Sequence, residues 1–134
     1  MNAWTLRILT AVCFFGVLGG ILRFELEHVG MGGTLLTNLI GSFGLGFFYE
    51  KAEHHSLPPW LVVGISSGLF GSFTTFSAFI SDTVQLTESS LLVAAAYAFA
   101  SLLGGFWFVR LGGWMASKRD RTAALQVQSN YDEE

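Results

Sequence analysis

The charged residues of this 134-residue chain are gathered into clusters, and four long stretches between them contain no Lys, Arg, Asp or Glu. These stretches cover residues 8–22, 28–49, 54–81 and 89–109. A helix needs about 20 mostly apolar residues to cross a bilayer. Three stretches meet that length, and the first meets it if Arg7 and Arg23 extend toward the two interfaces. The sequence therefore predicts an all-α membrane protein with four transmembrane helices.

The composition agrees and excludes other classes of protein. Hydrophobic residues make up 51% of the chain and charged residues 13%, whereas about a quarter of a typical soluble domain is charged. The net charge of −3 argues against a basic nucleic-acid binder, so we expect no nucleic-acid partner. The single cysteine, Cys13, excludes an intrachain disulfide framework. We expect the lipid bilayer to surround most of the chain.

Short connections make each predicted helix antiparallel to the one before it. The helices cover about residues 6–27, 33–52, 59–82 and 89–114. They form one transmembrane domain over residues 1–116, and we predict a polar, flexible tail over residues 117–134. No small-residue cleavage site precedes Arg23, so we expect the first helix to be retained.

Small residues recur at helix-packing spacing in three of these helices. They are Gly16, Gly20, Gly41, Gly44, Gly46, Gly104 and Gly105. In lipid, small residues let helix backbones approach closely, because the hydrophobic effect does not drive helix association there. Four short helices can hardly enclose a pore alone, so we expect a tight bundle that forms a dimer.

The centre of the third span has poor helix propensity. Residues 71–77 read GSFTTFS and follow Gly64, Ser66, Ser67 and Gly68. We predict a helix broken near its middle, whose freed carbonyls form an oxygen site for a hard cation. The alternative is a continuous helix whose hydroxyls bond back to the preceding turn, and the sequence favours neither.

Two rows of polar side chains at i, i+4 spacing each lie on one face of a helix. Thr34, Asn38 and Ser42 form one row, and Tyr97 and Ser101 form the other. Polar groups at this depth are often functional, and these rows could donate hydrogen bonds to a permeating anion. The alternative is ordinary hydrogen bonding between helices, worth about 0.6–2 kcal/mol per bond.

Two further features suit an anion. Phe76 and Phe79 follow the predicted break at i, i+3 spacing, and the edge of an aromatic ring is positive. Core packing is the alternative for two of thirteen Phe residues. Arg23 ends the first helix beside Glu25 and Glu27. It could attract anions at the mouth of a cavity, or it could pair with a carboxylate at the interface.

The sequence gives no support for an enzyme. It lacks a Cys/His metal set, a phosphate-binding glycine loop and a nucleophile elbow. The carboxylates Glu25, Glu50, Asp82 and Glu88 all fall near predicted helix ends. A small multidrug-type transporter is the alternative function, although a proton-coupled one would need a carboxylate within the membrane.

Three motifs follow one another along the first three spans. They are Gly19-Gly20-x-x-Arg23, Gly33-Thr34-Leu35-x-x-Asn38-x-x-Gly41-Ser42-Phe43 and Gly68-x-x-Gly71-x-x-Thr74-Thr75-Phe76-Ser77-x-Phe79. These motifs resemble those of the Fluc (CrcB-type) fluoride channels, in the same order, and the similarity covers roughly residues 16–105. The third motif is the most specific.

The resemblance implies an antiparallel, dual-topology dimer with two pores that passively exports fluoride across the bacterial inner (plasma) membrane. It implies a central structural sodium ion on the backbone carbonyls of Gly71 and Thr74, and it makes Arg23 a vestibule residue. The pore residues that we predict are Asn38, Phe76, Phe79, Thr34, Tyr97, Ser101, Ser42, Thr75 and Ser77. The chain departs from the family at Gly105, where some members carry a hydroxyl, and at Asp82, where a Glu is common.

The distribution of basic residues bears on how the dimer forms. Arg7, Lys51, Arg110, Lys118, Arg119 and Arg121 lie on the side of the predicted bundle shared by both termini. Arg23 lies on the other side, so the positive-inside rule predicts cytoplasmic termini. A chain with one orientation would need an oppositely oriented paralogue as its partner. A chain that inserts both ways would form the dimer with itself.

Overall fold

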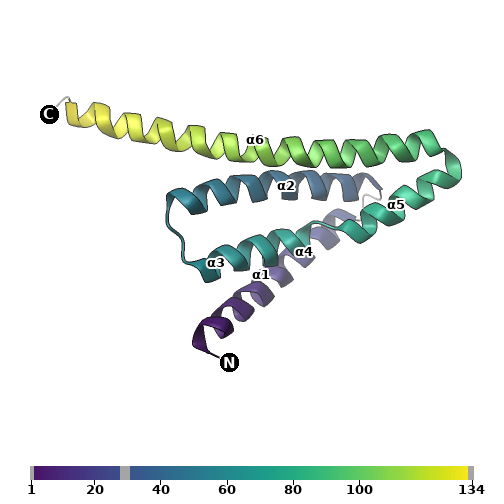
Figure 1. Cartoon of the computed structure of the whole chain (residues 1–134), viewed down its shortest axis with the longest axis horizontal. Coiled ribbons are helices and arrows are strands. Elements are labelled where there is room, and N and C mark those ends of the chain that lie inside the picture. Colours follow the sequence, from purple (N-terminus) through teal and green to yellow (C-terminus); the bar gives the residue numbers. More distant parts are fainter. Residues whose placement is uncertain (1, 28–30, 133–134) are drawn as a thin grey trace.

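The computed structural model describes residues 2–27 and 31–132, which are helical over almost their whole length (Figure 1). The helices are α1 (Ala3–Glu27), α2 (Met31–His54), α3 (Pro59–Val63), η1 (Gly64–Phe70), α4 (Gly71–Phe73), α5 (Phe76–Ser89) and α6 (Leu91–Asp132). The first predicted connection, at residues 29–32, lies partly outside the described residues, and its last two residues, Met31 and Gly32, already belong to α2. Both termini and the α2–α3 connection lie at one end of the molecule, and the α5–α6 turn lies at the other.

Three helical stretches of the described chain are long and apolar enough to span a membrane. They cover Ala3–Leu26, Pro59–Ser89 and Leu91–Thr122, so three of the four predicted spans are confirmed. The remaining helix, α2, has five Gly, two Thr, one Asn and one Ser among its apolar residues. It lies alongside α6 (Figure 1), which shields part of its polar surface.

The last helix is longer than we predicted. We expected it to end near Trp114 and to be followed by a flexible tail, but α6 continues to Asp132. The segment 117–132 contains no Gly or Pro and is rich in Ala, Arg, Lys and Gln, which favour helix. Lys51 of α2 also forms an ion pair with Asp120. Good helix propensity and this tie to α2 explain why the polar segment stays helical.

Glycines set the close contacts between helices. A Cβ at Gly46 of α2 would collide with the carbonyl oxygen of Val109, and one at Gly112 of α6 would collide with that of Phe43. The predicted packing role is therefore confirmed for Gly46. On α1, by contrast, a Cβ at Gly20 would meet nothing within 4 Å. Its neighbour Gly19 makes the tight contact instead, so our choice of Gly20 was wrong by one residue, because successive helical residues face different directions.

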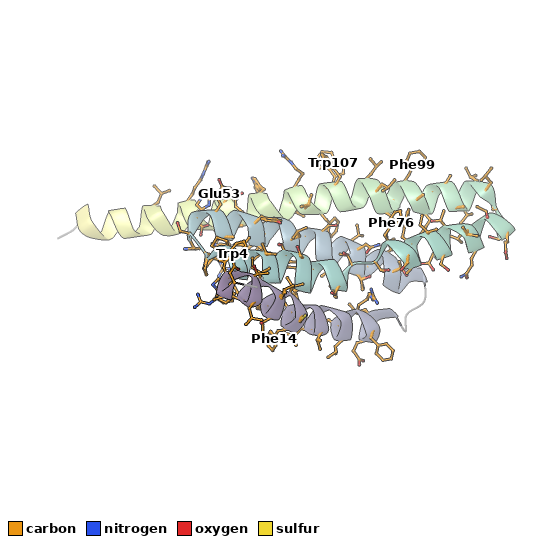
Figure 2. All side chains as sticks on the ribbon, turned by 60° about the horizontal axis from the view of Figure 1, so that its bottom comes forward. Trp4, Phe14, Glu53, Phe76, Phe99 and Trp107 are labelled. Atoms are coloured by element: carbon orange, nitrogen blue, oxygen red, sulfur yellow. The ribbon has the colours of Figure 1, made fainter. Side chains whose placement is uncertain are left out.

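Large apolar side chains cover the outside of the molecule. Figure 2 shows Trp4, Phe14, Phe76, Phe99 and Trp107 projecting from the helices, and all five are exposed. The buried apolar residues are mostly small ones. They are Ala11, Ala52, Phe73, Phe79, Ala94 and Ala116. So much exposed apolar surface is unusual for a soluble monomer and suits a chain surrounded by lipid or by another subunit.

Candidate functional site

Two residues with extended backbone separate α4 from α5. Thr74 has φ −80° and ψ 157°, and Thr75 has φ −142° and ψ 124°. The Thr75 side chain caps α5, because its Oγ1 accepts a hydrogen bond of 3.2 Å from the Ala78 N–H. The helical turns before this junction are widened, since η1 is π-helical from Gly64 to Phe70. Such widened turns are rare and often mark functional sites.

Hydroxyls before the junction bond back to their own helix. Ser66 Oγ donates to the Val62 carbonyl at 2.7 Å, and Thr74 Oγ1 donates to the Phe70 carbonyl at 2.9 Å. The back-bonding that the sequence left open is therefore present at these two residues. The Thr75 hydroxyl differs, because it accepts a hydrogen bond from the first turn of the following helix, α5. The change from one mode to the other coincides with the extended backbone.

Asn38 of α2 holds the junction with two hydrogen bonds. Its Nδ2 donates to the Thr75 carbonyl at 3.0 Å, and its Oδ1 accepts from the Thr75 N–H at 2.8 Å. A buried backbone group without a partner is costly, and the extended backbone at Thr75 has lost its helical partners. The Asn38 amide replaces them, which explains why an Asn stands opposite this point.

Two N–H groups at the junction do not donate to the carbonyls of Gly71 and Thr74, as they would in an unbroken helix. In a continuous α-helix the Thr75 N–H would donate to the Gly71 carbonyl, and the Ala78 N–H would donate to the Thr74 carbonyl. Here the first N–H donates to Asn38 and the second to Thr75 Oγ1. Both carbonyls are left able to accept from, or coordinate, another group.

Aromatic rings continue from the junction toward α6. Phe79 is 9% exposed and its ring centroid lies 5.9 Å from those of Phe76 and Tyr97. Phe76 is 74% exposed, so one side of this row is open. The Tyr97 hydroxyl donates to Asp82 Oδ2 at 2.9 Å. Asp82 thus orients Tyr97, a contact between α5 and α6 that the sequence could not reveal because spacing along one helix does not identify partners on another.

The remaining predicted side chains lie at different distances from this row. Thr34 and Ser101 are buried and lie beside the Tyr97 hydroxyl. Ser42 Oγ would lie 3.4 Å from a Cβ at Gly105, so the two polar rows meet across α2 and α6. Ser77 Oγ lies 3.3 Å from Thr75 Oγ1.

Two other residues stand apart from the junction. Arg23 lies near the C-terminal end of α1. Thr37 is fully buried and was not predicted, but its hydroxyl bonds the carbonyls of Gly33 and Thr34 within its own helix. We therefore assign Thr37 a local role.

A small cavity opens at the junction. It has a volume of about 220 Å³ and is lined by Asn38, Thr74, Thr75, Phe76, Phe79 and Leu102. A second cavity of about 220 Å³ shares Asn38 and Thr74 with the first and is also lined by Ser42, Ser66 and Gly71. Among the described residues no cluster of His, Cys, Asp or Glu could hold a metal ion. The arrangement offers an amide, hydroxyls and aromatic ring edges, which suit a small anion better than a bond-making reaction.

Comparison with known proteins gives consistent matches. The family described as "CrcB-like protein, Camphor Resistance (CrcB)" matches residues 10–113. The fluoride-specific ion channel FluC 2 of Ligilactobacillus salivarius is 43% identical over 80% of this chain and 83% of its own length. FluC 1 of Lactobacillus johnsonii is 41% identical over 85% and 91%. FluC of Leptospira interrogans is 35% identical over 81% and 94%.

Proposed function

This chain belongs to the CrcB-like family, and from that premise we propose that it is a channel that lets fluoride leave the cytoplasm passively across a bacterial plasma membrane. The relatives named above are fluoride-specific ion channels, and the family is one of multi-pass membrane proteins, not of enzymes. The observation that carries the proposal is the cavity in which Asn38 faces Thr75, Phe76 and Phe79. This membership also weakens the alternative of a multidrug-type transporter.

The chemistry of the cavity suits fluoride. Fluoride is small and strongly hydrated, so a pore must replace its water with other hydrogen-bond donors. The Asn38 amide is held by two bonds to Thr75, and the second Nδ2 hydrogen is left to donate to an ion. The edges of Phe76 and Phe79 add positive charge without water. Because these groups are fixed before the ion arrives, little ordering is required on binding.

A second subunit would complete the pore. Phe76 is 74% exposed beside the nearly buried Phe79, so one wall of the cavity is missing in a single chain. We propose an antiparallel dimer in which all four helices of each subunit, α2 included, span the membrane. Each subunit then supplies the missing wall for the other, and two pores result. Thr34, Ser42, Tyr97 and Ser101 extend the pathway, Thr75 and Ser77 border it, and Arg23 lies in its vestibule.

The carbonyls of Gly71 and Thr74 fit a structural sodium ion. Their usual N–H donors are bound to Asn38 and to Thr75 Oγ1, and Gly71 is exposed, where a second subunit could reach it. Two carbonyls from each subunit would give four oxygens, the ligand type that hard cations prefer. When bound, the ion would supply positive charge that offsets the cost of an anion at the low-dielectric centre. Replacing sodium with a bulky organic cation should then lower the melting temperature of the dimer.

The partner is either a second copy of this chain or a paralogue of opposite orientation. Both termini and the α2–α3 connection lie at one end of the molecule (Figure 1). The count of basic residues depends on this arrangement, because it compares the Lys and Arg residues near that end with those near the other. A strong bias toward cytoplasmic termini favours a paralogue. Accessibility labelling of both termini in a chain expressed alone tests this. An equal mixture of orientations with fluoride efflux would establish a homodimer.

Electrode-monitored fluoride efflux from liposomes tests the function directly. Liposomes that contain the purified protein should release fluoride down its gradient, and protein-free liposomes should retain it. A proton-coupled transporter of lipophilic cations would instead exchange such cations for protons and leave fluoride inside. Assembled protein that releases no fluoride would overturn the proposal.

A further inference from the structure

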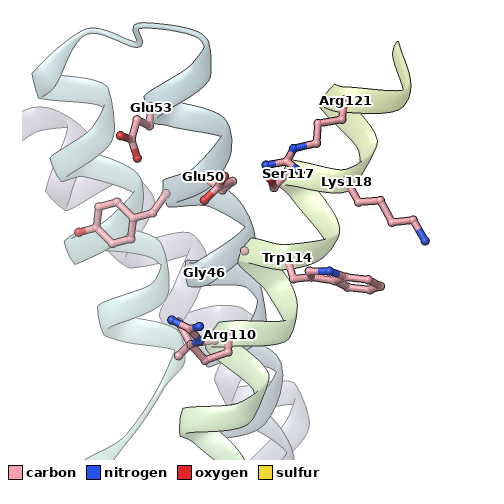
Figure 3. A pocket seen from close by; sticks show the side chains of 11 residues that line it. Gly46, Glu50, Glu53, Arg110, Trp114, Ser117, Lys118 and Arg121 are labelled. Atoms are coloured by element: carbon pink, nitrogen blue, oxygen red, sulfur yellow. The ribbon is translucent and has the colours of Figure 1, made fainter. Parts of the chain in front are cut away.

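A groove of about 700 Å³ opens between α2 and α6 and shares no lining residue with the two cavities at Asn38 (Figure 3). Gly113 contributes to its floor. A Cβ at Gly113 would lie 3.7 Å from the Gly46 carbonyl oxygen and 3.9 Å from Glu50 Oε2, so any side chain there would occupy the groove. The glycine at position 113 thus keeps open a space that the proposed channel pathway does not use.

The two walls of the groove carry opposite charges. Glu50 and Glu53 come from α2, and Arg110 and Arg121 come from α6. Figure 3 shows the Glu50 carboxylate and the Arg121 guanidinium facing each other across the groove. Within the described part of the chain none of these four side chains makes an ion pair within 4.0 Å. A ligand with both charges could therefore sit between the walls and satisfy both.

Two neighbouring lysines are already engaged. Lys51 pairs with Asp120. Lys118 lies over the Trp114 ring, with Nζ 5.1 Å from the ring centroid, and points away from α2 (Figure 3). Lys118 is itself a lining residue of the groove, but its ammonium group points away from α2, so two carboxylates and two guanidinium groups remain to face the open space. This balance favours a zwitterionic ligand over an anionic one.

The groove lies at the level of the lipid headgroups. Residues 89–109 of the chain carry no charge, whereas Lys118, Arg119, Asp120 and Arg121 follow soon after. Trp114 between them is exposed, and Trp is enriched at membrane interfaces. Trp107, Leu111 and Trp114 share one face of α6 and are all exposed. They form an apolar track along a face of α6 that points away from α2 (Figure 3), from the level of the groove toward the bilayer core, along which acyl chains could lie.

We propose that this groove binds the headgroup of phosphatidylethanolamine. Guanidinium groups bind phosphate well through paired hydrogen bonds, so the phosphate lies against Arg121, which faces Glu50 across the groove. The primary ammonium has three N–H donors and lies against Glu50 and Glu53. Phosphatidylglycerol lacks the ammonium and would leave the two carboxylates without a positive partner near its own negative phosphate. Phosphatidylcholine keeps the positive charge but has no N–H to donate.

Native mass spectrometry of the purified protein with the three lipids, each with the same acyl chains, tests this proposal. We expect phosphatidylethanolamine to be retained about tenfold over either competitor, the effect of one hydrogen bond to a charged group. The double variant Glu50→Gln/Glu53→Gln should lose this preference and should retain more phosphatidylglycerol than the unchanged protein, because only the basic wall remains. Glu88→Gln, an exposed carboxylate at the end of α5, is the matched control and should change nothing.

Two results would overturn the proposal. One is equal retention of the three lipids, or a preference for phosphatidylglycerol, by the unchanged protein, a measurement that does not depend on whether a variant folds. The other is an assembled double variant that keeps its preference for phosphatidylethanolamine. Neither measurement requires fluoride conduction, so the lipid site and the proposed function can fail independently.

Discussion

The close contact between α2 and α6, here called the seam, is made by backbone atoms of both helices. At the junction between α4 and α5, by contrast, the backbone is hydrogen-bonded to a side-chain amide from α2. At the seam, Gly46 and Gly112 let each helix rest against a carbonyl of the other. At the junction, Asn38 takes both hydrogen-bonding groups of Thr75. A close-packed helix keeps its backbone groups bonded within itself, but an interrupted helix has carbonyls to offer. The seam should therefore control assembly and the junction conduction.

The largest effect should come from filling the seam. Gly46→Val places a side chain where even a Cβ would collide with the Val109 carbonyl oxygen, and backbone cannot move aside cheaply. We expect little or no monodisperse protein on size-exclusion chromatography. Gly32→Ala is the control, since a Cβ there meets nothing within 4 Å. A well-assembled Gly46→Val protein would show that the seam does not hold the helices together.

The next effect should come from Asn38→Ala at the junction. The change leaves the Thr75 N–H and C=O without their partner, at a cost of about 1–3 kcal/mol for each group, and removes the proposed donor to fluoride. Efflux from liposomes should fall at least about tenfold, while chromatography shows the same assembly as the unchanged protein. If the assembled variant conducts like the unchanged protein, Asn38 has no role in the pathway.

Phe79→Ile tests the ring edges with a smaller expected effect. Isoleucine keeps the residue apolar but has no positive edge, so efflux should fall roughly two- to tenfold, in line with the strength of aromatic contacts. Phe106→Ile, on the exposed surface of α6, should conduct normally. Equal efflux from both variants would assign Phe79 to packing alone.

Tyr97→Phe separates the hydroxyl from the ring. The variant keeps the stack on Phe79 and loses the hydrogen bond to Asp82, which is worth about 0.5–1.5 kcal/mol. Efflux should fall about two- to threefold, and Asp82→Asn should have a similar or smaller effect because an amide oxygen can still accept. A complete loss of efflux in Tyr97→Phe would contradict a supporting role for this bond and would make the hydroxyl essential.

The smallest effect should come from Asp120→Asn, on the part of α6 that continues past the predicted end. It removes an ion pair with Lys51 whose side chains are 21% and 24% exposed, and such pairs contribute about 0–1 kcal/mol. The melting temperature should drop slightly and fluoride efflux should stay unchanged. A marked loss of efflux would connect this extension to the pore.

The two regions were not equally predictable from sequence. Glycine spacing identified Gly46 at the seam, but on α1 it selected Gly20, whereas Gly19 makes the contact. Adjacent residues of a helix face directions about 100° apart, so only one of two neighbouring glycines can face the other helix. At the junction, the GSFTTFS segment and Asn38 were both singled out. Their pairing was not, because Asn38 and Thr75 are 37 residues apart and the period of one helix does not specify what faces it.

Two other features escaped sequence reasoning for similar reasons. The Asp82–Tyr97 bond joins different helices, so the departure at Asp82 had no explanation until the helices were placed. The extension of α6 was missed because a polar, charged composition was taken to mean a tail, although its residues favour helix. Composition predicted where the membrane ends, not where the helix ends.

Selectivity between fluoride and chloride tests most directly the claim that the Asn38 junction forms a fluoride pathway. Liposomes that contain the purified protein are filled with equal concentrations of fluoride and chloride, and an electrode for each ion records its release. If the Asn38 junction is a narrow pathway lined by fixed hydrogen-bond donors, fluoride should leave rapidly and chloride should remain inside. Release of both ions at similar rates, or retention of both by an assembled protein, would contradict this account.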